Sequence, residues 1–138
     1  TLPNEFLADA KADVDKHVHG LCLCMVVHAF TTLHASILLI IAGAVIRHFP
    51  VGPGHDFMTS LERAMKHCIP APTLLVLNFP SNPTAQVCSL DVYRELVAFA
   101  KKHGVWLLSD LAYAEIYFDD NPPPSILQIE GARDVAVE

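Results

Sequence analysis

The sequence predicts an α/β fold in which helices flank a mostly parallel β-sheet. Two apolar runs, "TLLVLNF" (73–79) and "VWLLSD" (105–110), have the composition of strands that are buried on both faces of a sheet. Between them, residues 90–103 repeat apolar side chains at helical spacing. A strand, a helix and a strand in this order predict a βαβ unit whose two strands run in the same direction.

The composition favours one folded domain and excludes several function classes. The 138 residues are 52% hydrophobic and 17% charged, which suits a domain with a core of its own. A net charge of −6 gives no electrostatic basis for binding nucleic acid. No basic and then apolar leader opens the sequence, so secretion is not indicated. The four cysteines show no disulfide-like spacing, and we expect free thiols in a reducing, cytoplasmic compartment.

The N-terminal third is the least regular part of the chain. We expect a helix over 5–16 and another over 34–42, whereas the apolar run 21–29 fits helix or strand equally well. No Asp, Glu, Lys or Arg occurs between Lys16 and Arg47, a length that would permit a membrane helix. Because histidines and threonines interrupt this stretch, we favour a helix and a strand in a soluble core.

The next elements have clearer boundaries. "AVIRHF" (44–49) has the branched, alternating pattern of a strand, and Pro50 ends it. Residues 57–67 carry apolar side chains at helical spacing, and Lys66 and His67 suit the negative end of a helix.

The C-terminal half continues the alternation. Ser89 is the expected N-cap of the helix over 90–103, and Gly104 is its expected stop. "ILQI" (126–129) predicts a short helical turn, and "DVAVE" (134–138) predicts a further strand.

A rigid polar turn follows the strand over 73–79. In "NFPSNPTAQ" (78–86), Pro80 and Pro83 flank Asn82 and restrict the backbone, so we expect a fixed side-chain amide there. Asp110 ends the neighbouring strand. Parallel strands end at one edge of a sheet, where open α/β sheets bind ligands, so Asn82 and Asp110 are expected within reach of one ring-sized molecule.

Two interpretations of the residues after Asp110 stay open on composition and spacing alone. Asp110, Ala112 and Tyr113 supply an acid, a small residue and a phenol, which beside Asn82 could hold a polar aromatic ring. Alternatively, Asp110 caps a following helix and Tyr113 is a half-buried core residue, and composition and spacing favour this second interpretation.

The motifs themselves add a family resemblance. "NFPSNPTAQ" and "SDLAYAEIYFD" resemble the paired motifs of class I/II aminotransferases, the fold-type I pyridoxal-phosphate enzymes. The likeness is greatest to the bacterial alanine and diaminopimelate aminotransferase branch. It runs over 42–138 and implies an incomplete large domain of a pyridoxal-phosphate (PLP) transferase, preceded by a diverged part over 1–41. Family members often have Thr-Gly where this chain has Thr84-Ala85.

The resemblance implies roles for four residues. Asn82 and Tyr113 match the residues that hydrogen-bond the phenolic oxygen of pyridoxal phosphate. Asp110 matches the aspartate that pairs with the protonated pyridine nitrogen, so that the ring can accept electrons. Ala112 would lie against the ring face.

The resemblance also implies an activity for the parent enzyme. It would move an amino group from an amino acid, alanine being favoured, to a 2-oxo acid, and would act as a homodimer. The lysine that forms the Schiff base with the cofactor is expected beyond Glu138, and neither Lys101 nor Lys102 is placed to replace it. We therefore expect this chain alone to be inactive.

Three other interpretations concern the function of the chain or the sites it could hold. A non-catalytic α/β module that binds a ligand or a partner and retains relic motifs is the alternative function. A metal site formed by His17, His19, Cys22, Cys24 and His28 is not expected, because a Cys-x-Cys pair in an apolar run fits zinc spacing poorly. Association with a membrane is also not expected. Cys88 and His103 are expected to be packing or surface residues.

Overall fold

The computed structural model describes residues 22–26, 40–41, 44–49, 54, 56–82 and 84–138. The helix expected over 5–16 lies outside these residues, as does all of the helix expected over 34–42 except Ile40 and Ile41, which are helical.

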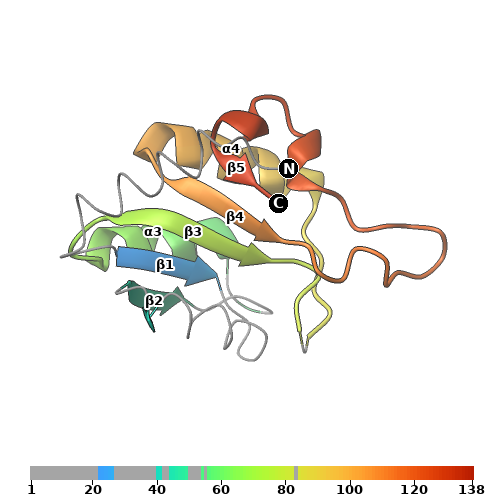
Figure 1. Cartoon of the computed structure of the whole chain (residues 1–138), viewed down its shortest axis with the longest axis horizontal. Coiled ribbons are helices and arrows are strands. Elements are labelled where there is room, and N and C mark those ends of the chain that lie inside the picture. Colours follow the sequence, from blue (N-terminus) through green and yellow to red (C-terminus); the bar gives the residue numbers. More distant parts are fainter. Residues whose placement is uncertain (1–21, 27–39, 42–43, 50–53, 55, 83) are drawn as a thin grey trace.

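A parallel sheet is the framework of the described part (Figure 1). Its strands have the spatial order β2-β1-β3-β4-β5, and every neighbouring pair is parallel. Their bounds are β1 Cys22–Val26, β2 Val45–Phe49, β3 Pro72–Asn78, β4 Trp106–Asp110 and β5 Ala136–Val137. The predicted α/β fold with a parallel sheet is thus confirmed, and the run 21–29, which fitted helix or strand, contains a strand.

Both helices with clear sequence boundaries form where they were predicted. Helix α3 spans Phe57–His67 and helix α4 spans Leu90–His103. The Ser89 hydroxyl accepts a hydrogen bond of 3.3 Å from the Val92 amide, and Gly104 has a left-handed φ of 66°, so the predicted N-cap and stop of α4 are confirmed. The N-cap of α3, which the sequence reading missed, is Asp56.

Four strands differ slightly from the prediction. Strand β2 begins one residue late, at Val45. Strand β4 begins one residue late because the Val105 amide donates to Ala100 O at the end of α4 instead of joining the sheet. Strand β3 ends at Asn78, and Phe79 already belongs to the following turn. The strand expected over 134–138 is shorter, because the 3₁₀ helix η2, Ala132–Asp134, occupies its beginning. A second 3₁₀ helix, η1, spans Ile126–Gln128 and confirms the short helical turn.

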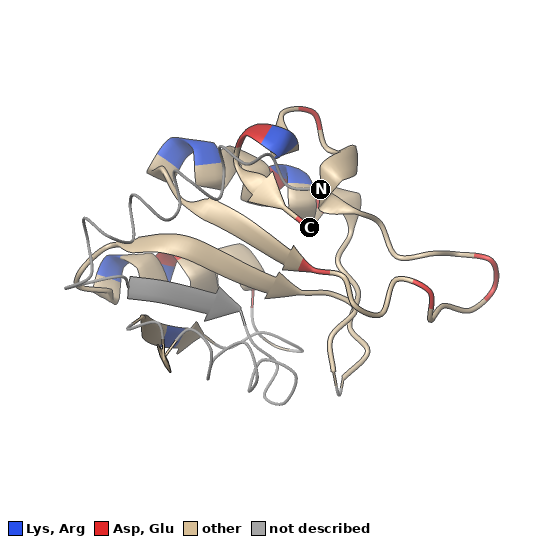
Figure 2. Cartoon of the chain, viewed as in Figure 1, with Lys and Arg blue, Asp and Glu red and all other residues tan. Residues whose placement is uncertain are grey.

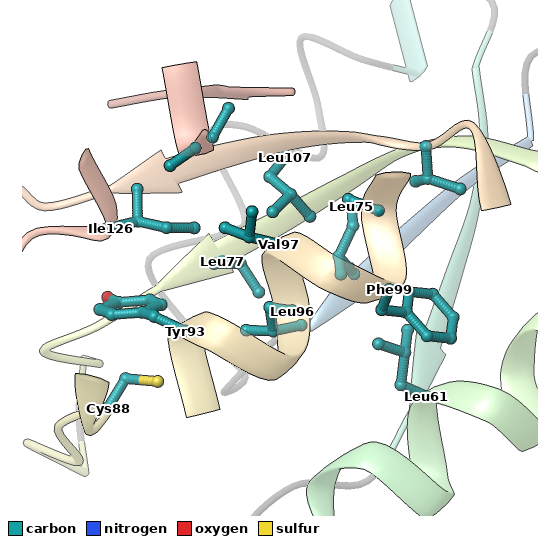
Figure 3. Packing of buried hydrophobic residues seen from close by; sticks show 14 of the residues in the cluster. Leu61, Leu75, Leu77, Cys88, Tyr93, Leu96, Val97, Phe99, Leu107 and Ile126 are labelled. Carbon is teal, nitrogen blue, oxygen red and sulfur yellow. The ribbon is translucent and has the colours of Figure 1, made fainter. Parts of the chain in front are cut away.

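The main core lies between one face of the sheet and the helices α3 and α4. Figure 3 shows side chains of α4 pointing toward side chains of β3 and β4, and it labels Leu61, Leu75, Leu77, Cys88, Tyr93, Leu96, Val97, Phe99, Leu107 and Ile126. Val76 points to the other face, where it packs with Ala44, Ile46 and Leu108. Strand β3 is therefore buried on both faces, as its continuous apolar sequence predicts.

Candidate active site

Strands β3 and β4 end side by side. Asn78 and Asp110 are register partners at their last positions, and the Asn78 side-chain amide donates to Asp110 O over 3.4 Å. The turns after the two strands therefore start at one edge of the sheet, as Figure 1 shows. This confirms the expected arrangement of the two motifs.

Polar side chains within the turn hold it in shape. The buried Asn78 side chain accepts a hydrogen bond of 3.3 Å from the backbone amide of Asn82. The buried Ser81 hydroxyl bonds the Thr84 hydroxyl at 2.6 Å, and Ser81 O accepts from the Ala85 amide at 2.7 Å. The sequence predicted that prolines make the turn rigid, and the roles of Asn78 and Ser81 were not predicted. Pro83 itself lies outside the described residues.

The side chains of Asn82 and Tyr113 meet across the two turns. Asn82 Nδ2 donates a hydrogen bond of 2.9 Å to Tyr113 Oη, and both side chains are partly buried. Because the phenol oxygen accepts this bond, its own O–H proton is available for a further acceptor. An amide and a phenol thus present donors at nearly the same place.

Asp110 is partly buried at the end of β4, where Figure 2 shows an acidic residue at the tip of the strand. Its Oδ1 accepts a hydrogen bond of 3.2 Å from the Ala112 amide. Turns follow it, closed by the bonds from Ala114 N to Leu111 O and from Ile116 N to Tyr113 O. The interpretation in which Asp110 caps a helix is therefore wrong, although Tyr113 is half-buried as that interpretation required.

A cavity of about 470 Å³ opens beside the Asn82–Tyr113 pair. Its lining comes from the two turns and consists of Pro80, Ser81, Asn82, Ala85, Val87, Tyr113, Ile116, Tyr117, Phe118, Asp119, Asn121 and Pro123. Among the described residues, Asp110 and Ala112 do not line it. The four predicted site residues thus share one edge of the sheet, but only two of them border this cavity. Another cavity, of about 240 Å³, lies on the outer surface of α3 and involves none of them.

The buried titratable groups of the core are not reactive centres. Burial raises the pKa of the Cys88 thiol to about 12, so it stays protonated at neutral pH. Burial also raises the pKa of Tyr93. Cys88 is a packing residue and His103 lies on the surface with its ring against Phe99, both as predicted.

Two site types are not found in the described part of the chain. No group of three His, Cys, Asp or Glu side chains there could hold a metal ion. His17, His19 and His28 lie outside the described residues, as do the side chains of Cys22 and Cys24. In the same part of the chain, no helix is long and apolar enough to cross a membrane.

Comparison with known proteins decides the family. Residues 31–137 match the family model for aminotransferase class I and II. The chain belongs to this family. The resemblance seen in the two motifs is thereby confirmed, and the non-catalytic alternative finds no support among the related proteins.

Its relatives include members of the expected branch. The protein AatC of Rhizobium meliloti (strain 1021) is 56% identical over 81% of this chain and 26% of its own length. The glutamate-pyruvate aminotransferase AlaC of Escherichia coli (strain K12) is 50% identical over 72% of this chain and 24% of its own length. An LL-diaminopimelate aminotransferase of Gloeobacter violaceus is 42% identical over 72% of this chain and 25% of its own length. The chain therefore spans about a quarter of the length of these relatives.

A solved structure shares the fold. The aromatic aminotransferase of Pyrococcus horikoshii OT3 superposes with a TM-score of 0.70 and 22% identity, over 85% of this chain and 31% of that protein. The sheet and helices described above are thus part of a fold that this solved aminotransferase shares.

Proposed function

We propose that this chain forms the part of an aminotransferase that holds the ring of pyridoxal phosphate. In this proposal Asn82 and Tyr113 hydrogen-bond the phenolic oxygen of the cofactor, Asp110 pairs with its pyridine nitrogen, and Ala112 lies against the ring face. The observation that carries the proposal is the hydrogen bond of 2.9 Å between Asn82 Nδ2 and Tyr113 Oη, at the sheet edge that Asp110 shares.

The chemistry of these groups suits that ring. A phenolate oxygen is an acceptor, and it would meet an amide N–H and a phenol O–H that already lie within hydrogen-bond distance of each other. A protonated ring nitrogen is a cation, and a carboxylate is its natural partner. When bound, the cofactor would supply a ring that accepts electrons from the substrate.

Each residue of the chain has a defined task in this proposal. Asp110 keeps the proton on the ring nitrogen, because removing that proton would leave its carboxylate without a cationic partner. Asn82 and Tyr113 orient the opposite edge of the ring and stabilise negative charge on its oxygen. The bond from Ala112 N to Asp110 Oδ1 fixes the direction in which the carboxylate faces.

The substrates and the assembly are proposed for the whole protein, of which this chain spans a part. We favour alanine and 2-oxoglutarate, since one relative is called a glutamate-pyruvate aminotransferase and the amination of pyruvate gives alanine. A cytoplasmic homodimer is the proposed assembly. The lysine that binds the cofactor covalently, and the division of the chain at residue 42, stay predictions.

A titration of the 138-residue chain with pyridoxal phosphate tests the proposal. A new absorption band of bound cofactor that Asp110→Ala weakens would support it. The absence of any band at millimolar cofactor would contradict it. We expect bound cofactor but no transaminase turnover from this chain alone, as the family resemblance implies.

A further inference from the structure

One carboxylate joins both ends of the segment that carries the candidate site. Glu138 Oε1 accepts hydrogen bonds from Ser109 Oγ at 3.0 Å and from the Ile126 amide at 3.2 Å. Glu138 Oε2 accepts from Ser125 Oγ at 2.5 Å. None of the roles described above uses this residue.

The donors come from the two boundaries of one segment. Ser109 directly precedes Asp110 at the end of β4, and Ser125 and Ile126 begin η1. Between these boundaries, residues 110–124 hold Asp110, Ala112, Tyr113 and half of the cavity lining, and they consist of turns and irregular backbone after Asp110. Such a segment has few bonds of its own to fix its shape, so ties at its ends matter most.

Burial strengthens the bond from Ser109, whereas Glu138 itself and its bond with Ser125 are exposed. The Ser109 side chain is 3% exposed, and a buried hydroxyl without its acceptor would lose a hydrogen bond that water could not replace. Hydrogen bonds to a carboxylate are shorter and stronger than those between neutral groups. Ser125 Oγ also accepts a hydrogen bond of 3.1 Å from the Leu127 amide, so the same serine fixes the start of η1.

We infer that Glu138 is a positioning residue, whose carboxylate holds the segment 110–124 in the shape that brings Tyr113 to Asn82. It acts through Ser109, Ser125 and Ile126 and does not itself border the cavity. The shape of the segment is a property of the chain by itself, and only its consequence for cofactor binding rests on the proposed function.

Three variants separate the possible outcomes. Glu138→Ala removes the three hydrogen bonds that the Glu138 carboxylate accepts from Ser109, Ser125 and Ile126. Glu138→Gln keeps an oxygen for Ser109 and Ile126, and its amide can donate to Ser125. Glu130→Gln makes the same chemical change at an exposed position two residues beyond η1 and serves as the matched control.

Two readouts follow the segment without any cofactor. Amide hydrogen exchange over 111–121 reports how often the segment opens, since residues 122–124 are prolines without an N–H. The NMR resonance of the Asn82 side-chain amide reports the bond to Tyr113. Tyr113→Phe gives the resonance position expected when that bond is lost. Circular dichroism checks that each variant folds. If Glu138→Ala does not fold, Ser125→Ala takes its place; it removes one of the three donors to the carboxylate together with the cap of η1.

We expect Glu138→Ala to speed exchange about fivefold or more, the effect of losing at least one charged hydrogen bond. We expect it to move the Asn82 resonance toward its position in Tyr113→Phe, and Glu138→Gln to lie closer to the wild type. The inference is overturned if Glu138→Ala matches Glu130→Gln in either readout, or if the glutamine variant is as loose as the alanine variant. A failed cofactor titration with a positive exchange result would remove the proposed function and leave this inference in place.

Discussion

The side-chain amide of Asn82 donates a hydrogen bond of 2.9 Å to the phenol of Tyr113, across 31 positions of sequence. This bond joins the turn after β3 to the turn after β4. It places two donors where a single acceptor oxygen of a ligand could use both.

Removing the Tyr113 hydroxyl should weaken cofactor binding. Tyr113→Phe keeps the ring but loses one hydrogen-bond donor, so we expect the affinity for pyridoxal phosphate to fall about fivefold, near 1 kcal/mol. Absorbance titration measures this change. Tyr117→Phe is the matched control, because Tyr117 lines the same cavity and is 43% exposed. Equal effects of the two variants would argue against a specific role for Tyr113.

Neutralising Asp110 should weaken binding more strongly. Asp110→Asn keeps an oxygen for the Ala112 amide, so the turn should persist, but it removes the charge that would pair with the pyridine nitrogen. We expect a loss of about tenfold or more in affinity, because a hydrogen bond between charged groups is worth roughly twice a neutral one. Asp120→Asn, at an exposed position after β4 that does not line the cavity, should leave the affinity unchanged. An Asp110 variant that binds as well as the wild type would rule out the proposed pairing.

Glycine at position 85 should stabilise the turn. Ala85 has a left-handed φ of 53°, a conformation that costs a residue with a Cβ roughly 1–2 kcal/mol. Glycine removes this cost but has a more flexible unfolded state, so we expect Ala85→Gly to raise the free energy of unfolding by up to about 1 kcal/mol. Urea denaturation measures it. Ala98→Gly, inside α4, is the contrasting control and should destabilise the chain by a similar amount. A destabilised Ala85→Gly chain would contradict the expectation.

The N-cap of α3 should make stability depend on acid pH. The Asp56 carboxylate accepts a hydrogen bond of 2.7 Å from the Thr59 amide, and this bonding with Thr59 lowers the pKa of Asp56 below its usual 3.8. Because the folded state favours the ionised form, this contribution is present above pH 3.8 and is lost as the pH falls through the lowered pKa.

Thermal unfolding of the wild type and of Asp56→Asn at several pH values tests this linkage. We expect the gap between the two to be constant near neutral pH and to shrink on acidification below 3.8. Asparagine also caps helices, so α3 should still form in the variant. A gap that widens toward acid would show that the sign is wrong.

Local signals explain which elements could be predicted from the sequence. Helix α4 has a serine cap, an apolar face and a terminal glycine, so both of its ends are marked within a few residues. The two site motifs were predictable because each directly follows a buried apolar strand. Strand β5 has only two residues and η2 in front of it only three, too few for a periodic pattern of side chains to mark either element.

Several supporting polar contacts could not be predicted because they join residues that are far apart in the sequence. Asn78 looked like the end of a strand, and its bond to Asp110 depends on the pairing of β3 with β4. Glu138 and Ser109 are far apart in sequence, and neither belongs to a recognisable motif. The residues proposed to touch the cofactor were predicted from the sequence, and those that hold them in place became visible only in three dimensions.

The strand order β2-β1-β3-β4-β5 has a consequence for how this family can diversify. From β1 the chain proceeds toward one side of the sheet, and from β3 it proceeds toward the other, so the topology reverses between these two neighbours. At such a reversal the loops above the sheet diverge and leave a crevice, whichever side chains they carry. The turn with Asn82 follows β3 at this point. Substitutions in the turn after β3 could therefore change which molecule is recognised, while the sheet beneath it stays the same.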